Sequence, residues 1–236
     1  MTRTGRSLPA THRVKLCGIA TLLLALACSG EQPALSYADR IVSDRAAKDR
    51  FFREDPSSPI PAAERSAFPP LRYFAPDESY RVPASLRVST ENAGQVIKIP
   101  TSTGLVREMV RIGALEFSLK GQPLTLTAFA EVGDRQMNRL FVPFSDLTTG
   151  TETYAGGRYL DLDRTATGLY LIDFNRAYHP YCVYNPVYDC PYPPRENRLP
   201  IPVRAGERLP SEETGGAAPG QTHEAPGSRH RSSIDQ

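Results

Sequence analysis

Apolar and polar side chains alternate with a period of two through much of residues 82–174. Leu115, Phe117 and Leu119, for example, are separated by Glu116 and Ser118. Successive side chains of a β-strand point to opposite faces of its sheet, so this alternation predicts strands with one buried and one solvated face. A fold built around a sheet is therefore expected.

Short runs of this kind follow one another, with turn residues such as Gly121-Gln122-Pro123 between them. No helical pattern separates the runs, so neighbouring strands are expected to pair antiparallel. The sequence predicts a mainly β fold, a single antiparallel meander closed as a barrel or folded as a sandwich. The expected strands are residues 84–88, 95–99, 105–111, 115–119, 124–129, 140–144, 157–162 and 169–174.

One amphipathic helix is predicted before the sheet, over residues 36–54. Ser36 and Asp39 have the spacing of a capping box, and Asp55-Pro56 ends the run. The apolar stripe of this helix would contain Leu35, Ala38, Ile41, Val42, Ala46 and Phe52.

The following residues, 56–76, are rich in proline but also contain Phe68, Leu71, Tyr73 and Phe74. A solvated linker is one interpretation of this segment. So many apolar groups favour an ordered wrap across the surface of the domain.

The N-terminus has the pattern of a secretory signal. Four basic residues precede an uncharged apolar run over residues 16–27, which is too short to span a bilayer but fits a signal sequence. The run ends in Leu24-Ala25-Leu26-Ala27-Cys28, which resembles the lipobox of bacterial lipoproteins. We expect a signal peptide over residues 1–27 and a lipidated tether over 28–34. Plain cleavage, an uncleaved anchor and a misassigned start are the alternatives.

Lipidation of Cys28 would attach the protein to a membrane of the bacterial cell envelope. Ser29 directly after this cysteine resembles a signal for the outer membrane, which predicts a domain facing the periplasm. Loss of 27 residues with four basic and no acidic groups leaves 24 basic and 26 acidic groups, a net charge of −2. Nothing in this balance indicates nucleic acid as a partner.

A single β-rich domain is expected over residues 35–208. The chain after it, residues 209–236, is rich in Gly, Ser, Glu and Pro and has almost no large apolar side chain. Such a segment cannot repay the entropy of ordering, so a disordered tail is predicted.

Chemically versatile side chains gather in a proline-rich loop after the last predicted strand. They include Asp173, Asn175, Cys182, Cys190, Glu196 and Asn197. Proline fixes φ and removes backbone donors, so the loop can hold polar side chains in place without a regular ladder. This composition is unusual for a simple connector and predicts a site.

Several blocks of the chain resemble one family. They are Phe141-Val-Pro-Phe-Ser-Asp146 with the following residues to Asp161, Asp173-Phe-Asn-Arg-Ala-Tyr178, Cys182, Cys190-Pro191, Pro193-Pro-Arg-Glu-Asn-Arg-Leu199 and Ala205-Gly-Glu207. Together they are similar to the bacterial and archaeal family called domain of unknown function 1684, over about residues 50–208. The resemblance implies no activity. At His179 the chain differs from the resembling sequences, which generally have Asn or Pro.

The two cysteines of the loop allow three interpretations. In an oxidising compartment, Cys182 and Cys190 are expected to form a disulfide that closes a short loop. A zinc site from His179, both cysteines and Glu196 has suitable ligand types but no recognised spacing, and free thiols are the third alternative. We predict the disulfide, with no metal and no cofactor. A triad would have to use His179 as its base, which is disfavoured before Pro180.

Candidate binding residues are Tyr154, Arg158, Asn175, Glu196 and Asn197. The segment Tyr154-Ala-Gly-Gly-Arg158 could bind an anion through backbone N–H groups and the guanidinium. The structural alternative is a hairpin turn in which Arg158 pairs with an aspartate.

Asp161, Asp173 and Glu196 are candidates for acid–base chemistry. Asp173 shares the predicted strand face of Leu169 and Leu171, so it is expected to be buried, with Arg158 as its partner.

Three functions are compatible with these residues. The leading hypothesis is an envelope lipoprotein that binds a small polar or anionic ligand where the turn at 146–158 meets the loop at 173–197. Its first alternative is a metal-independent hydrolase or lyase that uses Asp173, Glu196 and Tyr154 as catalytic residues. Its second is a non-catalytic structural or interaction module.

Overall fold

The computed structural model describes residues 35–134 and 138–209. The predicted signal peptide, Cys28 with its tether, and the tail beyond residue 209 lie outside these residues. Within the described part, the search for a helix long and apolar enough to cross a membrane found none.

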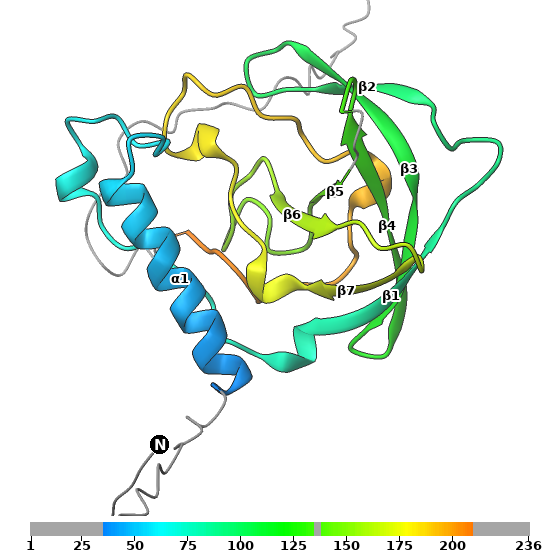
Figure 1. Cartoon of the computed structure of the whole chain (residues 1–236), viewed down its shortest axis with the longest axis horizontal. Coiled ribbons are helices and arrows are strands. Elements are labelled where there is room, and N and C mark those ends of the chain that lie inside the picture. The colour runs from blue at the N-terminus through cyan, green and yellow to red at the C-terminus, as the bar shows by residue number, and fades with distance from the viewer. Residues whose placement is uncertain (1–34, 135–137, 210–236) are drawn as a thin grey trace, which may run out of the picture. The chain divides into compact units, whose positions relative to one another are not determined.

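The described residues form one antiparallel sheet that is nearly closed as a barrel (Figure 1). Its order is β6-β5-β4-β3-β1-β7, and β2 also pairs with β3. The mainly β prediction is confirmed, with the barrel as the arrangement adopted. The strands are β1 Arg81–Arg87, β2 Val96–Pro100, β3 Val106–Leu119, β4 Gln122–Glu131, β5 Arg139–Phe144, β6 Arg158–Asp163 and β7 Leu169–Asp173.

The inward face of this sheet forms the main core. On β5, Leu140 and Val142 are fully buried, and they pair in register with Leu162 and Leu160 of β6. Phe174, at the end of β7, lies among these side chains with its ring 5.4 Å from that of Phe144. The other residues of this cluster include Val82, Leu115, Phe117, Leu126, Tyr170 and Ile172.

Two strands that the sequence separates, 105–111 and 115–119, are one long strand, β3. The pairing of β3 with β4 shifts by one residue between Arg111 and Gly113, which is a β-bulge. A Cβ at Gly113 would lie 2.6 Å from the carbonyl oxygen of Arg87 on β1, so only glycine fits there without a shift. The gap in the alternation therefore marks a bend within a strand instead of a turn between two strands.

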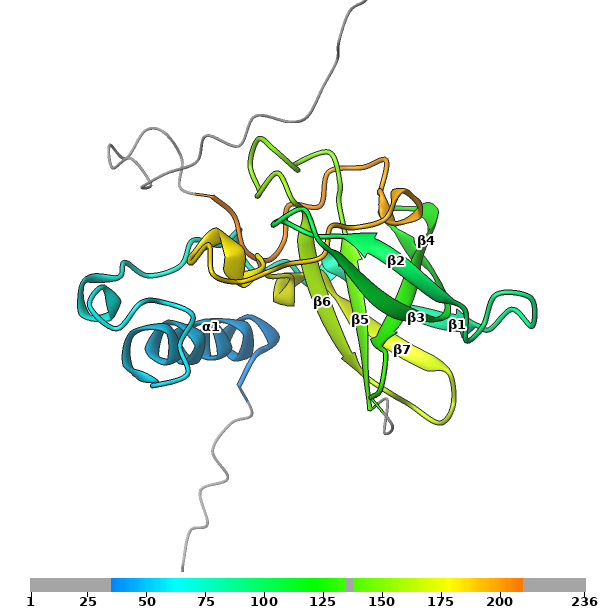
Figure 2. The ribbon, with the colours of Figure 1, turned by 90° about the horizontal axis from the view of Figure 1, so that it is seen from above.

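Helix α1, Tyr37–Glu54, lies to one side of the barrel (Figures 1 and 2). The Ser36 hydroxyl accepts a hydrogen bond from the Asp39 amide at 3.1 Å, and the helix ends before Asp55, both as predicted. Its buried face is narrower than the predicted stripe. Ile41 and Phe52 are buried, whereas Val42 is 55% exposed.

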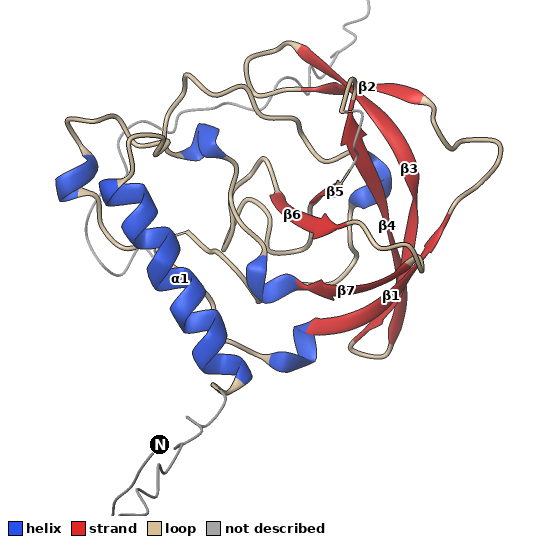
Figure 3. Ribbon diagram, viewed as in Figure 1, coloured by secondary structure: helices blue, strands red, loops and turns tan. Residues whose placement is uncertain are grey.

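The proline-rich segment after α1 packs against it. Ser58 and Ile60 are buried, and the ring of Phe68 lies 5.9 Å from that of Phe52. These contacts are those of the predicted wrap. Short 3₁₀ helices punctuate the irregular segments (Figure 3); they are Arg65–Ala67, Glu78–Tyr80, Phe174–Arg176, Tyr181–Val183 and Arg195–Asn197.

Candidate functional site

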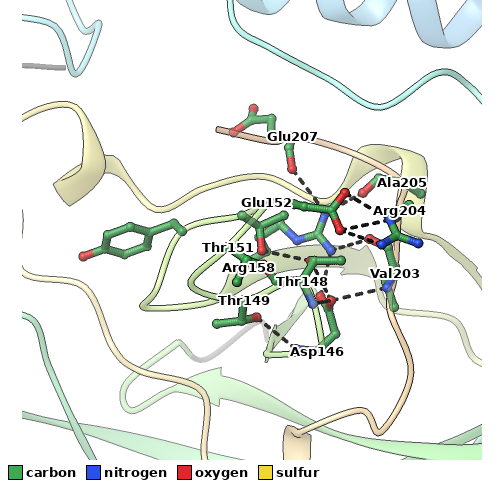
Figure 4. A network of polar contacts seen from close by, with 12 residues as sticks. Asp146, Thr148, Thr149, Thr151, Glu152, Arg158, Val203, Arg204, Ala205 and Glu207 are labelled. Atoms are coloured by element: carbon green, nitrogen blue, oxygen red, sulfur yellow. Dashed lines mark hydrogen bonds and ion pairs between the residues drawn. The ribbon is translucent and has the colours of Figure 1, made fainter. Parts of the chain in front are cut away.

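Arg158 lies at the centre of a buried polar network at the start of β6 (Figure 4). Its side chain is fully buried, and Nη2 lies 2.8 Å from Asp146 Oδ2. Its terminal nitrogens also donate to the backbone carbonyls of Val203, Ala205 and Glu207. Burial lowers the pKa of Arg158, and the adjacent Asp146 carboxylate opposes that shift.

This geometry differs from the expected pairing of Arg158 with Asp173. The partner is Asp146, which reaches Arg158 from the loop after β5. Both terminal nitrogens of the guanidinium bind the C-terminal segment. This arrangement agrees with the alternative in which Arg158 pairs with an aspartate and has a structural role.

Asp173 is buried, although for a different reason from the one expected. The side chains of Leu169 and Leu171 are 65% and 45% exposed, so their face of β7 points away from the core. Helix α1 covers Asp173 instead, because the Tyr37 hydroxyl donates to Asp173 Oδ1 at 2.8 Å. Asn175 also donates to Oδ1, and Arg176 lies 3.5 Å from Oδ2, so this carboxylate is bound from both α1 and the chain after β7.

Two asparagines that were candidates for ligand binding pair with the backbone. Asn175 accepts from the Asp77 amide at 2.9 Å and donates to the Asp77 carbonyl at 2.8 Å. Asn197 does the same with Thr127 of β4, at 2.7 and 2.9 Å. Both side chains are buried. Each one gives a backbone amide and a backbone carbonyl the hydrogen bonds that a neighbouring strand would otherwise supply.

The proposed catalytic trio is dispersed. Glu196 forms an ion pair with Arg111 at 2.7 Å and is 42% exposed. Among the described residues, no hydrogen bond or ion pair joins any two of Asp173, Glu196 and Tyr154. The three residues thus make no direct polar contact at the predicted meeting point of the two loops, and their catalytic role stays a prediction.

His179 is buried beside Tyr154. Its Nε2 accepts the Tyr154 amide at 3.3 Å, and its own amide donates to Glu207 Oε2 at 2.7 Å. Burial, together with the positive charges of Arg158 and Lys48, lowers the pKa of His179 to about 3. The imidazole is consequently neutral at ordinary pH, with one nitrogen already engaged.

Cys182 and Cys190 are neighbours but are not joined to each other. The Cys182 amide lies 3.3 Å from Cys190 Sγ. Their disulfide stays a prediction, and this proximity is compatible with it.

A cavity of about 700 Å³ lies on the outer face of the sheet, where residues 178–191 cross β3 to β6. We call it the tyrosine cavity. Phe141 of β5 pairs in register with Asp161 of β6, and both point away from the core that contains Leu140 and Leu160. The wall of the tyrosine cavity includes Lys48, Arg107, Glu131, Asp134, Arg139, Phe141, Tyr159, Asp161, Tyr178, Tyr181, Tyr188, Asp189 and Cys190.

Aromatic rings form much of this wall and pack on one another. Phe141 and Tyr159 have ring centroids 4.7 Å apart, and those of Tyr159 and Tyr178 are 5.8 Å apart. Tyr181 and Tyr188 make a second pair at 5.3 Å. Edge-to-face packing of this kind holds the rings in fixed orientations around the space.

Asp161 is the wall residue with the most distinctive electrostatics. The Tyr178 hydroxyl donates to Asp161 Oδ2 at 2.9 Å. Solvent reaches this carboxylate through the cavity, but the surrounding protein displaces much of its water and raises its pKa. The hydrogen bond from Tyr178 and the more distant charge of Arg139 oppose this shift without cancelling it.

The cations of the wall have other partners. Lys48 pairs with Glu207, Arg107 lies 3.8 Å from Asp189, and Arg139 lies 3.9 Å from Asp163. Within the described ranges, no Lys, Arg or His nitrogen lies within 4.0 Å of the Asp161 carboxylate. Among the residues that the structure describes, Asp161 thus presents to this aromatic cavity a carboxylate without a cationic partner.

The sequence singled out Asp161 as an acid–base candidate, but not the cavity around it. Its wall comes from α1, four strands and the loop after β7, which no single motif connects. The available signal was the outward face of β5 and β6, where Phe141, Tyr159 and Asp161 alternate with core residues. Asp173 lines a second cavity of about 520 Å³ near Tyr37, and Asp161 is part of that wall as well.

Comparison with known proteins places this fold in a family. The model described as "Protein of unknown function (DUF1684)" matches residues 66–208. The solution NMR structure of an uncharacterised protein of Haloarcula marismortui is 39% identical, with a TM-score of 0.57, and the match covers 72% of this chain and 93% of that chain. No curated protein matches the chain. The chain belongs to the DUF1684 family of proteins of unknown function.

Proposed function

We propose that the domain binds a small polar ligand in the tyrosine cavity, and that an ammonium group of this ligand pairs with Asp161. The observation that carries the proposal is the Asp161 carboxylate, which receives one hydrogen bond from Tyr178 and has no cationic partner within the described residues. A cavity of about 700 Å³ is large enough for a small organic molecule.

A positively charged group suits this wall better than an anion. The pKa of Asp161 is raised chiefly because the surrounding protein displaces its water, and a carboxylate that has lost water is stabilised by an opposite charge. Aromatic rings can also stabilise an ammonium group, and the Lys48 ammonium already lies 4.8 Å from the centroid of the Tyr178 ring. An anionic ligand would need Arg107 or Lys48, which already pair with Asp189 and Glu207.

The binding domain would sit at a membrane of the cell envelope. The support for this location is the basic N-terminus, the apolar run at 16–27 and the cysteine at position 28. Lipid on Cys28 would attach the domain to the outer membrane, facing the periplasm. The tyrosine cavity would then sample small molecules of that compartment.

The test compares three small probes of similar size and different charge: ethanolamine, ethylene glycol and glycolate. Chemical shifts of the full chain in detergent are followed by NMR as each probe is added. Ethanolamine should shift resonances of Tyr178 and Tyr159 at millimolar concentrations, and ethylene glycol should do so much more weakly. Stronger binding of glycolate would favour the anionic ligand, and no response to any probe would contradict the proposal.

The variant Asp161→Asn tests whether the charge of this carboxylate is needed for binding. It keeps an oxygen that can accept from Tyr178 but removes the charge, so ethanolamine binding should weaken roughly 10- to 100-fold, as expected for a hydrogen bond to a charged group. Glu116→Gln is the control. Glu116 is an exposed carboxylate of β3 that pairs with Arg87 at 3.0 Å, and it is not part of the cavity wall.

The pKa of Asp161 gives the expected pH dependence. Because this pKa is raised, the carboxylate takes up a proton at a higher pH than an ordinary aspartate does, and ethanolamine binding should decline as the pH falls through that value. The same shift means that folding favours the protonated form. Asp161→Asn should therefore keep or raise the melting temperature at neutral pH, and a large loss of stability would indicate a structural role instead.

A further inference from the structure

The two cysteines of the loop after β7 form a contact pair whose members have different surroundings. Cys182 lies in the short helix Tyr181–Val183 and is half-buried, whereas Cys190 is only 7% exposed. Cys190 is held by Ser102, because its amide donates to Ser102 Oγ at 3.1 Å and its carbonyl accepts the Ser102 amide at 2.9 Å.

Hydrogen-bond donors gather around the sulfur of Cys182. The thiol of Cys190 contributes first, and the hydroxyls of Ser102 and Tyr154 add to it, while burial acts in the opposite direction. These donors lower the pKa of the Cys182 thiol to about 7. The pKa of Cys190 is raised, because its thiol donates to Cys182. Cys182 is thus the thiol that ionises first and that solvent reaches.

We propose that Cys182 and Cys190 form a redox-active pair that exchanges with external disulfides, with Cys182 as the attacking thiol and Cys190 as the resolving thiol. The contact between the two residues, the hydroxyls around Cys182 and the difference in exposure support these two roles. The proposal does not rest on the ammonium site at Asp161, although Cys190 also lines the tyrosine cavity.

The exchange has two steps. The Cys182 thiolate bonds to one sulfur of the external disulfide, whose S–S bond breaks and releases a first thiolate with its electron pair. Cys190 then gives its proton to solvent and bonds to the Cys182 sulfur, which breaks the mixed disulfide and releases a second thiolate. Both released thiolates take up protons. The protein loses two electrons and the external disulfide gains them.

This inference differs from a permanent structural disulfide in its reversibility. A structural bond in a secreted protein resists reduction by glutathione, and an inert buried dithiol resists oxidation by glutathione disulfide. A redox-active pair should change state in both directions. Because the loop between the two cysteines carries Tyr188 and Asp189, the change would also alter how firmly one wall of the tyrosine cavity is held.

The experiment uses the full chain with Cys17→Ser and Cys28→Ser, so that Cys182 and Cys190 are its remaining cysteines. The protein is equilibrated in mixtures of glutathione and glutathione disulfide, its thiols are blocked by alkylation, and the disulfide fraction is measured by mass spectrometry. We expect a two-state transition within the range of these mixtures. A pair that stays oxidised in excess glutathione, or reduced in excess glutathione disulfide, overturns the proposal.

Single cysteine variants distinguish the two roles. With Cys190→Ser, glutathione disulfide should leave one glutathione bound to Cys182, because the resolving thiol is missing. With Cys182→Ser, the buried Cys190 should remain unmodified. Tyr154→Phe removes one hydroxyl from Cys182 and should slow its alkylation severalfold at neutral pH, with a smaller effect at high pH. Equal reactivity of the two single cysteines, or the reverse order, would reject the assigned roles.

Discussion

At the scale of single residues, three buried polar side chains that the sequence offered as site residues bind the backbone. Arg158 holds three carbonyls of the C-terminal segment, and Asn175 and Asn197 each hold the amide and carbonyl of one residue. Irregular segments leave peptide groups without ladder partners, and a buried group without a partner is costly. Side chains that appear functional in the sequence thus replace missing secondary structure.

The Arg158 pair gives the first prediction at this scale. Arg158→Met would leave the Asp146 carboxylate and the carbonyls of Val203 and Ala205 buried without their donor. Removal of one partner of a buried ion pair costs about 3–5 kcal/mol, so the urea midpoint should fall sharply. Arg204→Met is the control, because Arg204 pairs with Glu152 at the surface and its loss should leave the midpoint close to that of the wild type. Equal effects of the two variants would contradict this account.

At the scale of elements, the alternation of side chains predicted the positions of most strands, because a strand such as the end of β3 buries alternate residues. It could not distinguish a bulge from a turn, since both interrupt the period of two; the bulge at Gly113 made one strand appear as two. The exposed face of β7 was misassigned for a related reason. Leu169 and Leu171 are apolar but lie outside the core, and Asp173 is bound by Tyr37 of α1 and by Asn175.

The bulge gives a prediction for the element that contains it. Gly113→Ala would force a Cβ to within 2.6 Å of the Arg87 carbonyl and 3.1 Å of Leu86 Cδ1, so β1 and β3 must separate locally. Overpacking at such a site costs about 1–3 kcal/mol, which urea denaturation can measure. Ser118→Ala, at an exposed position of the same strand, should change stability by less than about 0.5 kcal/mol. A neutral Gly113→Ala variant would show that the strands can adjust.

At the scale of the whole molecule, the tyrosine cavity joins residues that are far apart in the chain. Lys48, Arg107, Asp161 and Tyr188 meet there because the nearly closed sheet and the crossing loop bring α1, β3, β6 and residues 178–191 together. The spacing of these residues in the sequence does not predict that their side chains line one cavity. The chemical character of Asp161 could be predicted, whereas its companions required the fold.

The last prediction concerns the proposed lipid anchor at Cys28. The apolar run of residues 16–27 is too short for a stable span, so attachment is expected to depend on lipid at Cys28. Cys28→Ala should abolish labelling by a fatty acid. Because one lipidated residue supplies the proposed anchor, the unlabelled protein should also be released from the membrane fraction. Ser29→Ala, a change of similar size at the next residue, should keep the label. If Cys28→Ala is still labelled, lipid is attached elsewhere and the predicted tether over residues 28–34 is wrong.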